Sequence, residues 1–290
     1  MNTIWSDYIQ GANTLHRSRK LRFHDLFANQ YKALFSLDEN AELKILEIGC
    51  GTGALAEALH KWYPNAEIVA IDRDSSFIDY AKHHVQNVTF VEGDATDLPF
   101  EDESFDVVIS NTVCEHIEPG AFYGEQRRVL KQNGVCLVLS SRKGIKVEPY
   151  CYAQCEYEKN FWCEAEKHDD SIATYEIGKY STNEAQMPAI MQKYGFKNID
   201  TGYAITDLTL DSPKYSPEFA RSIIDADRYC EIESVESVAK SMPDLFSKEQ
   251  IAKMKETVNA KYDNRAILYD SGKKLWDTTV CVIMVLRGLK

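Results

Sequence analysis

Short apolar runs alternate with segments of helical period along most of the chain. The apolar runs predict strands over 43–48, 67–71, 88–91, 105–110, 135–140, 196–204 and, near the C-terminus, 278–287. The segments between them predict helices over 52–62, 75–85, 122–131 and 183–194. Short apolar strands that alternate with helices form a parallel sheet covered on both faces. The predicted fold class is therefore α/β with a doubly wound sheet.

The expected lid and the residues between the last two predicted strands depart from this alternation. Residues 142–182 are acidic, aromatic and irregular, which is typical of a lid over a site. Two helix-start signals follow later, at Ser216 before a proline and at Ser247, which forms a capping box with Gln250. We expect an N-terminal helical arm over 1–40 and a helical insertion over 206–275. The core, which includes the lid, is expected over 41–205 and 276–290.

Composition narrows the class of partner. The 290 residues include 33 basic and 45 acidic side chains, a formal net charge of −12. This balance disfavours nucleic acid and anionic membrane surfaces, because both carry negative charge. The N-terminus lacks the pattern of a signal peptide, and the apolar stretch 280–286 is too short to span a bilayer. The eight scattered cysteines are then expected to be reduced thiols, and the expected location is the cytoplasm.

The stretch KILEIGCGTGALAEAL leads from a buried strand through a glycine loop into a helix. Gly49, Gly51 and Ala54 fit the G-x-G-x-x-G/A spacing of dinucleotide sites, and Gly49, Gly51 and Gly53 fit a tighter G-x-G-x-G. Glycines at such a turn let the backbone approach a ligand, and the helix N-terminus offers free amides. The glycine spacing alone leaves the ligand open.

Two carboxylates beside this loop restrict the choice. Glu47 ends the strand before the loop, where it would repel a pyrophosphate but suit an ammonium group. S-adenosylmethionine (SAM) carries an ammonium and no phosphate, so Glu47 favours SAM over NAD. Asp72 ends the next strand, where an acid accepts hydrogen bonds from the ribose of either ligand.

The decisive segment follows the third strand. FVEGDATDLPFEDESFDVVIS (90–110) and RRVLKQNGVCLVLS (127–140), together with the glycine loop and Asp72, resemble the class I SAM-dependent methyltransferases. The resemblance implies a Rossmann-like sheet of seven strands whose last strand is antiparallel. It also implies that SAM lies over the carboxyl ends of the first four strands and leaves as S-adenosylhomocysteine. A SAM-binding sensor or regulator without turnover is the alternative, and an NAD-linked oxidoreductase is less favoured.

The resemblance also assigns site residues. Glycines of the loop would hold the methionine portion, Asp72 the ribose, and Asp94 with Ala95 the adenine, while Asn111 follows the fourth strand at a SAM contact. The full set of predicted cofactor contacts is Arg22, Glu47, Gly49, Cys50, Gly51, Gly53, Asp72, Arg73, Asp94, Ala95 and Asn111.

Arg22 belongs to LHRSRKLRF, the most basic stretch of an acidic chain. A solvated helix face is the usual explanation of such a run. The arm is, however, similar to the one that precedes the first strand in ubiquinone-pathway O-methyltransferases, where an arginine at this position reaches SAM. Pairing of a guanidinium with the SAM carboxylate is then expected from Arg22, with Arg17 and Arg19 as less favoured candidates.

The segment SNTVCEHIEPG leaves the fourth strand toward the expected site. Glu115 and His116 resemble a pair in the same O-methyltransferases that, with an earlier glutamate, holds a metal ion. Thr112 stands at that earlier position, so no metal is expected. His116 is either a general base for the acceptor or a packed histidine that orients the loop. A base is dispensable where the acceptor is held in line with the methyl group.

The predicted function is methyl transfer to an O, N or C atom of a small molecule, shaped by the lid and the insertion. The acidic lid favours a neutral or cationic acceptor over a polyanion. The spacing of Cys151, Cys155 and Cys163 does not match a zinc pair, and these cysteines are expected to fill space under the lid. The sequence leaves the acceptor and the oligomeric state open.

Overall fold

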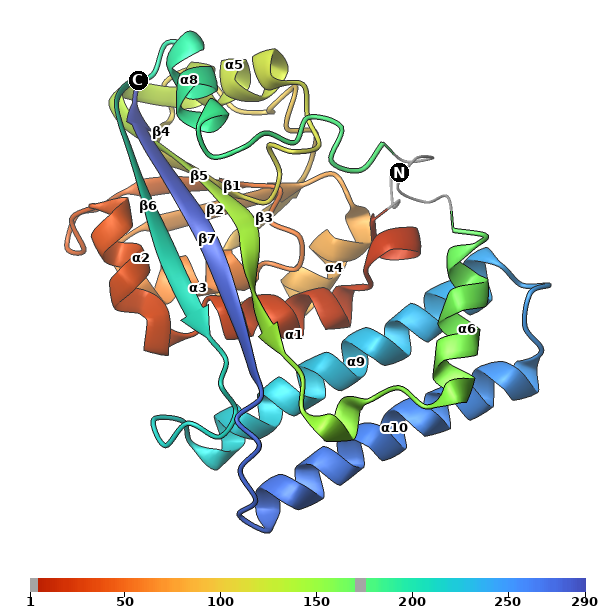
Figure 1. Cartoon of the computed structure of the whole chain (residues 1–290). Coiled ribbons are helices and arrows are strands. Elements are labelled where there is room, and N and C mark those ends of the chain that lie inside the picture. Colours follow the sequence, from red (N-terminus) through yellow and green to blue (C-terminus); the bar gives the residue numbers. More distant parts are fainter. Residues whose placement is uncertain (1–4, 170–175) are drawn as a thin grey trace.

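The computed structural model describes residues 5–169 and 176–290 and contains one seven-stranded sheet (Figure 1). The strands are Lys44–Ile48 (β1), Glu67–Asp72 (β2), Thr89–Glu92 (β3), Phe105–Asn111 (β4), Leu130–Val147 (β5), Lys197–Asp207 (β6) and Thr278–Leu289 (β7). Their order is β3-β2-β1-β4-β5-β7-β6, and β7 runs antiparallel to both neighbours. The predicted α/β, Rossmann-like doubly wound sheet with an antiparallel last strand is therefore confirmed.

Helices cover both faces of this sheet (Figure 1). They are η1 (Trp5–Ile9), α1 (Ala12–Arg22), η2 (Asp25–Phe27), α2 (Ala28–Phe35), α3 (Ala54–Trp62), α4 (Ser75–His84), α5 (Pro119–Val129), η3 (Tyr150–Tyr152), α6 (Glu156–Glu166), α8 (Gln186–Lys193), α9 (Pro217–Ser241) and α10 (Lys248–Asp270). One core joins α1 to α4 and α9 to the sheet face of Ile45 and Val285. A second core joins α5 and α8 to the opposite face, that of Leu46 and Leu286. Because successive side chains of a strand point to opposite faces of the sheet, each strand contributes to both hydrophobic cores.

The insertion between β6 and β7 consists of α9 and α10, which lie side by side and are crossed by α6 (Figure 1). Both predicted helix starts are confirmed. The Ser216 side chain accepts from the Phe219 amide at 3.1 Å, and Ser247 forms a capping box with Gln250. These caps satisfy amide groups that a helix leaves unpaired at its first turn.

The structure differs from the predicted pattern around the expected lid. β5 continues to Val147, well past the predicted end, because it pairs with β7 from Val135 to Val147. That partner lies far away in the sequence, so local periodicity does not reveal the longer strand. The segment that was expected to be irregular also contains α6, whose Phe161 stacks on Phe246. The part of the expected lid at 170–175, like residues 1–4 of the arm, lies outside the described residues.

A buried ion cluster fastens the insertion to the start of β7. The Arg265 side chain has 0% exposure and pairs through Nη2 with Asp211 at 2.9 Å and with Asp277 at 2.6 Å. Asp211 also accepts the backbone amides of Leu275 at 2.7 Å and Trp276 at 2.9 Å. The guanidinium therefore neutralises carboxylates that would otherwise lie buried without a counter-charge.

Arg265→Met is expected to lower the free energy of unfolding by about 3–5 kcal/mol, since it leaves these carboxylates unpaired. Urea denaturation followed by circular dichroism measures the change. The matched control is Arg221→Met, because Arg221 pairs with Asp270 on the surface with its side chain 51% exposed. That change is expected to cost less than about 1 kcal/mol. Equal losses in the two variants would contradict the assigned role of the cluster.

Candidate functional site

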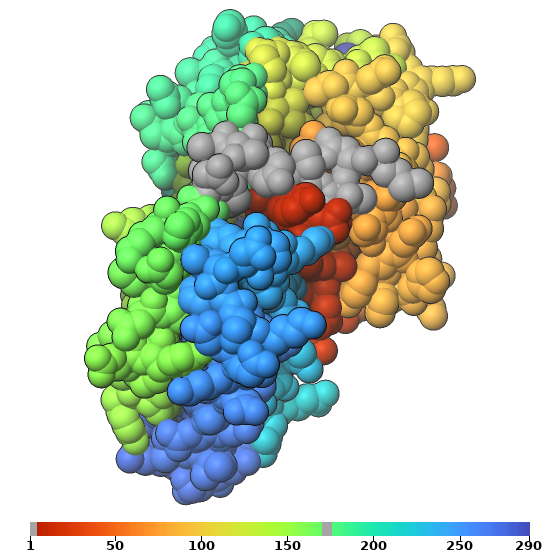
Figure 2. Space-filling view, turned by 90° about the vertical axis from the view of Figure 1, so that its right-hand side faces the viewer, coloured from red at the N-terminus to blue at the C-terminus, as the bar shows by residue number. Residues whose placement is uncertain are grey.

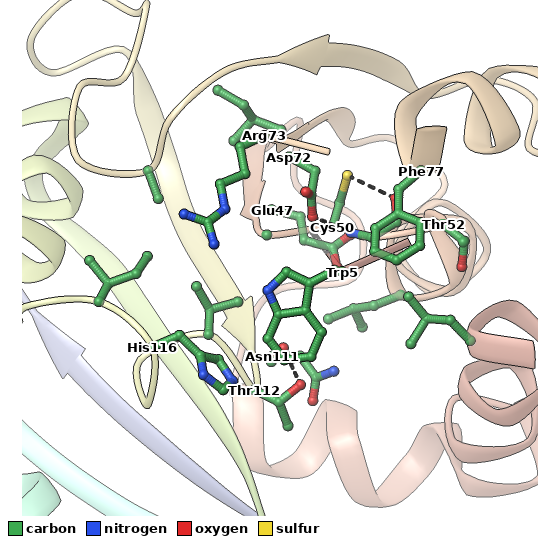
Figure 3. A pocket seen from close by; sticks show the side chains of 18 of the residues that line it. Trp5, Glu47, Cys50, Thr52, Asp72, Arg73, Phe77, Asn111, Thr112 and His116 are labelled. Atoms are coloured by element: carbon green, nitrogen blue, oxygen red, sulfur yellow. Dashed lines mark hydrogen bonds between the residues drawn. The ribbon is translucent and has the colours of Figure 1, made fainter. Parts of the chain in front are cut away.

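A cavity of about 500 Å³ lies at the carboxyl ends of β1, β2 and β4, beneath α1 and the N-terminal arm (Figure 3). Figure 2 shows the arm, in red, lying between the helical insertion and the part of the core that contains α4. Carboxyl ends of parallel strands are the usual place for ligands in this type of sheet. Most of the predicted cofactor contacts line this cavity, namely Glu47, Gly49, Cys50, Gly51, Asp72, Arg73, Asp94, Ala95 and Asn111.

The glycine loop is built by backbone geometry that other residues rarely adopt. Gly49, Gly51 and Gly53 have φ angles of 68°, 52° and 77°. A Cβ on Gly49 would lie 2.4 Å from Val113, and one on Gly53 would lie 2.7 Å from the Phe90 ring. Gly49 and Gly51 border the cavity, whereas Gly53 starts α3 and makes room for a packed ring. The requirement for glycine is therefore partly ligand access and partly packing.

The Asp72 carboxylate is oriented by two backbone amides. Oδ2 accepts from Gly51 N at 2.8 Å, and Oδ1 accepts from Asp74 N at 2.9 Å. Burial raises the pKa of Asp72, and these hydrogen bonds oppose the rise. A carboxylate oxygen offers two lone pairs, so each oxygen retains capacity for a ligand hydroxyl.

Several buried acceptor atoms beside the loop make no hydrogen bond with the described part of the chain. They are Glu47 Oε2, Thr52 Oγ1 and Asn111 Oδ1. Glu47 is only 2% exposed, and burial together with the nearby Asp72 raises its pKa well above the usual range. Buried polar atoms normally have partners. Their clustering at one cavity indicates a ligand that donates hydrogen bonds there.

Two arginines of α1, Arg19 and Arg22, are candidates for pairing with the SAM carboxylate. Arg19, one turn before Arg22 on α1, lines the cavity. Burial and the charge of Arg22 lower the pKa of Arg19 to about 9. Nε and Nη1 of Arg22 are buried without partners among the described residues, and its carbonyl accepts from Thr206 Oγ1 at 3.3 Å. Among the described residues that line the cavity, Arg19 is present and Arg22 is not. The resemblance pointed to this helix but favoured Arg22 over Arg19.

The loop after β3 also lines the cavity. Asp94 Oδ1 accepts from the Thr96 amide at 2.8 Å and from Thr96 Oγ1 at 2.7 Å. Ala95 and Thr96 line the cavity beside it. This is the turn that the resemblance assigns to the adenine, and Thr96 was not predicted. A threonine three residues after Gly93 does not by itself indicate a ligand contact in a single sequence.

His116 lines the cavity and lies across it from Glu47 and Cys50 (Figure 3). Its Nδ1 accepts the Gly178 amide at 3.0 Å, and its ring meets the Trp5 indole edge-on with the centroids 4.9 Å apart. Burial lowers the pKa of His116, which favours the neutral ring. Glu115 is turned away toward Ser140 Oγ, which donates to its carboxylate. Trp5 and Gly178 come from distant segments, and sequence reasoning did not find them.

The other candidate groups lie elsewhere or do not assemble. Within 5–169 and 176–290, no three His, Cys, Asp or Glu side chains gather as a metal-binding group. All eight cysteines are free, and Cys155 and Cys163 are exposed at or on α6. Among the described helices none has the length and apolar character needed to cross a bilayer.

Comparison with known proteins bears on this cavity directly. Residues 46–138, which contain the glycine loop, Asp72, Asp94 and Asn111, match the family model described as "Methyltransferase domain". The chain is 36% identical over 103 residues to a fatty-acid O-methyltransferase of Mycolicibacterium smegmatis, covering 34% of this chain and 37% of the relative. It is 34% identical over 104 residues to a demethylmenaquinone methyltransferase of Thermotoga maritima, covering 36% and 45%. The matches thus span less than half the length of these relatives.

Solved structures show the fold. The phosphoethanolamine N-methyltransferase 2 of Haemonchus contortus, in complex with SAM, superposes with a TM-score of 0.52 at 18% identity, covering 99% of this chain and 59% of that one. The [4+2]-cyclase SpnF superposes with a TM-score of 0.50 at 17% identity, covering 92% and 80%. These superpositions show a shared fold, and residues 46–138, less than half of the chain, match the methyltransferase-domain model.

Proposed function

We propose that this chain is a SAM-dependent methyltransferase that acts on a small-molecule acceptor and releases S-adenosylhomocysteine. The observation that carries the proposal is the set of buried, unpartnered acceptors Glu47 Oε2 and Asn111 Oδ1 beside the glycine loop. An ammonium group donates to such atoms, and a pyrophosphate does not. The cavity therefore fits the methionine end of SAM better than the phosphates of NAD.

Each part of SAM has a counterpart among the residues of this cavity. Glu47 and Asn111 would accept from the ammonium, and Arg19 would pair with the carboxylate. Asp72 would accept from the ribose hydroxyls, and the turn at Asp94 would border the adenine. The matching of charges along one cavity is what supports this assignment.

Bound SAM supplies an electrophilic methyl group on a sulfonium. The protein's own contribution is to orient the reactants and to limit water at the mouth of the cavity. Trp5 and Tyr180 line that mouth from the arm and from the segment after α6. Methyl transfer is an in-line displacement. Holding the acceptor atom in line with the methyl carbon and the sulfur therefore supplies most of the rate enhancement. Glu115 is engaged with Ser140, which leaves it no evident part in the chemistry.

The setting of the reaction is also part of this proposal. The formal net charge of −12 supports a small molecule over nucleic acid as the acceptor. Eight unpaired thiols support a reducing compartment, and we propose the cytoplasm.

Turnover is tested by incubating the full chain with methyl-labelled SAM and a metabolite extract. The expected result is S-adenosylhomocysteine together with a labelled product, both detected by mass spectrometry. Asp72→Ala is the negative comparison, because it removes the carboxylate proposed to hold the ribose and the hydrogen bonds that orient the glycine loop, and it is expected to give no product. SAM binding without product from any extract would instead favour a sensor or regulator.

Arg19→Gln is expected to raise the SAM dissociation constant on the order of tenfold or more, since it removes a charge-assisted hydrogen bond to the carboxylate. Without ligand, the same variant is expected to melt at the same or a higher temperature, because a half-buried, desolvated cation beside Arg22 is lost. Calorimetric titration and thermal unfolding measure the two effects. Arg22→Gln is the comparison, and a larger loss of SAM affinity there would show that Arg22 makes the contact.

A further inference from the structure

We call the part of the cavity lining that the proposed SAM contacts do not use the acceptor compartment. Its walls are apolar and come from three segments: Trp5 from the arm, Val113 and Ile117 after β4, and Tyr180 after α6. Such walls suit an apolar or aromatic body. The polar groups that face this compartment then indicate which reacting group the body carries.

His116 presents a hydrogen-bond donor to this compartment. Its Nδ1 accepts the Gly178 amide at 3.0 Å, so Nδ1 carries no proton. In the neutral ring the proton therefore resides on Nε2. A protonated Nε2 donates a hydrogen bond and cannot remove a proton from an acceptor. This geometry argues against the general-base role that the sequence allowed for His116.

Arg73 adds a cation on the same side of the cavity. Its side chain extends into the cavity toward His116 (Figure 3), and its charge lowers the pKa of that histidine. Arg73 is exposed, and it forms no hydrogen bond or ion pair with the residues of 5–169 and 176–290. The sequence analysis counted Arg73 among the cofactor contacts without assigning it a part of SAM. Its guanidinium extends across the cavity (Figure 3).

The carboxylates that line the cavity already have other roles. Asp72 accepts from the Gly51 amide of the glycine loop, and Asp94 accepts from the Thr96 amide of its own loop. Glu118 caps α5 by accepting from the Ala121 amide at 2.8 Å. Glu176 pairs with Lys179 at 2.8 Å. Glu47 is buried beneath the glycine loop. No free carboxylate in the described lining is thus placed to act as a base for an acceptor near His116.

We infer that the acceptor is a carboxylic acid with an apolar body, bound by Arg73 and His116 Nε2–H and converted into its methyl ester. The inference rests on the proposed function. One carboxylate oxygen attacks the methyl carbon, the O–CH3 bond forms, and the S–CH3 bond breaks with its electron pair going to sulfur. No proton moves, so the absence of a base from the described lining is no obstacle.

Other acceptors fit these residues less well. A phenol or a carbon acid has to lose a proton, and an alkyl amine is protonated and positively charged near neutral pH. Arg73 repels a protonated amine. The acidic lid led us to expect a neutral or cationic acceptor rather than a polyanion, but among the described residues the unpaired charge that faces this compartment is the positive charge of Arg73. A carboxylate is anionic near neutral pH and needs no activation.

The experiment uses the full chain, methyl-tritiated SAM and two groups of substrates: a metabolite extract, and octanoate and 3-phenylpropionate as defined probes. Products are treated with alkali, which releases the label of a methyl ester as volatile methanol and leaves ethers and methylamines intact. Label that is mainly volatile supports the inference. Label that is alkali-stable overturns it and leaves the methyltransferase function standing. SAM binding without labelled product contradicts the proposed function itself.

Arg73→Gln then tests the binding residue with the acceptor that is labelled. The KM for that acceptor is expected to rise about tenfold or more, and the SAM dissociation constant is expected to change less than about twofold. Arg73→Lys is expected to restore part of the affinity, because the charge is kept. Arg127→Gln, on the exposed surface of α5, is the matched control. Weaker SAM binding with an unchanged acceptor KM would return Arg73 to the nucleoside and overturn the assignment.

Discussion

The Asp72 carboxylate holds together the segments that form the site. Its two oxygens accept the amide of Gly51 in the glycine loop and the amide of Asp74 at the start of α4. The Asp74 carboxylate in turn caps α4 and accepts from both the amide and the hydroxyl of Ser6 in the arm, at 2.9 and 3.0 Å. Asp72 thus holds the glycine loop, and Asp74 holds the N-terminal arm beside it.

The site contains polar atoms whose burial is costly without a ligand. Arg19 is a desolvated cation beside a second arginine, and Glu47 is a buried acid without a partner for Oε2. A protein that only had to fold would gain stability by replacing such groups with apolar ones. Their presence is explained by a ligand that carries opposite charges at the matching places. SAM, with a carboxylate and an ammonium at one end, has that pattern.

The sequence predicted what local spacing determines and missed what distant segments contribute. Glu47, the glycine loop and Asp72 follow from strand ends, because parallel strands carry their carboxyl ends to one edge of the sheet. Arg22 was favoured over Arg19 because of the resemblance to ubiquinone-pathway O-methyltransferases, and a resemblance of sequence does not determine which side chain enters the cavity. Trp5 and Gly178 contact His116 only through the folded chain. The extension of β5 likewise depends on pairing with β7.

The central claim is that this cavity binds SAM through unpartnered charged and polar groups. Calorimetric titration of the unmodified chain with SAM and, separately, with NAD tests it most directly. The account predicts that SAM binds at least about tenfold more tightly than NAD, because the unpartnered acceptors Glu47 Oε2 and Asn111 Oδ1 suit an ammonium group and not a pyrophosphate. Tighter binding of NAD would contradict it.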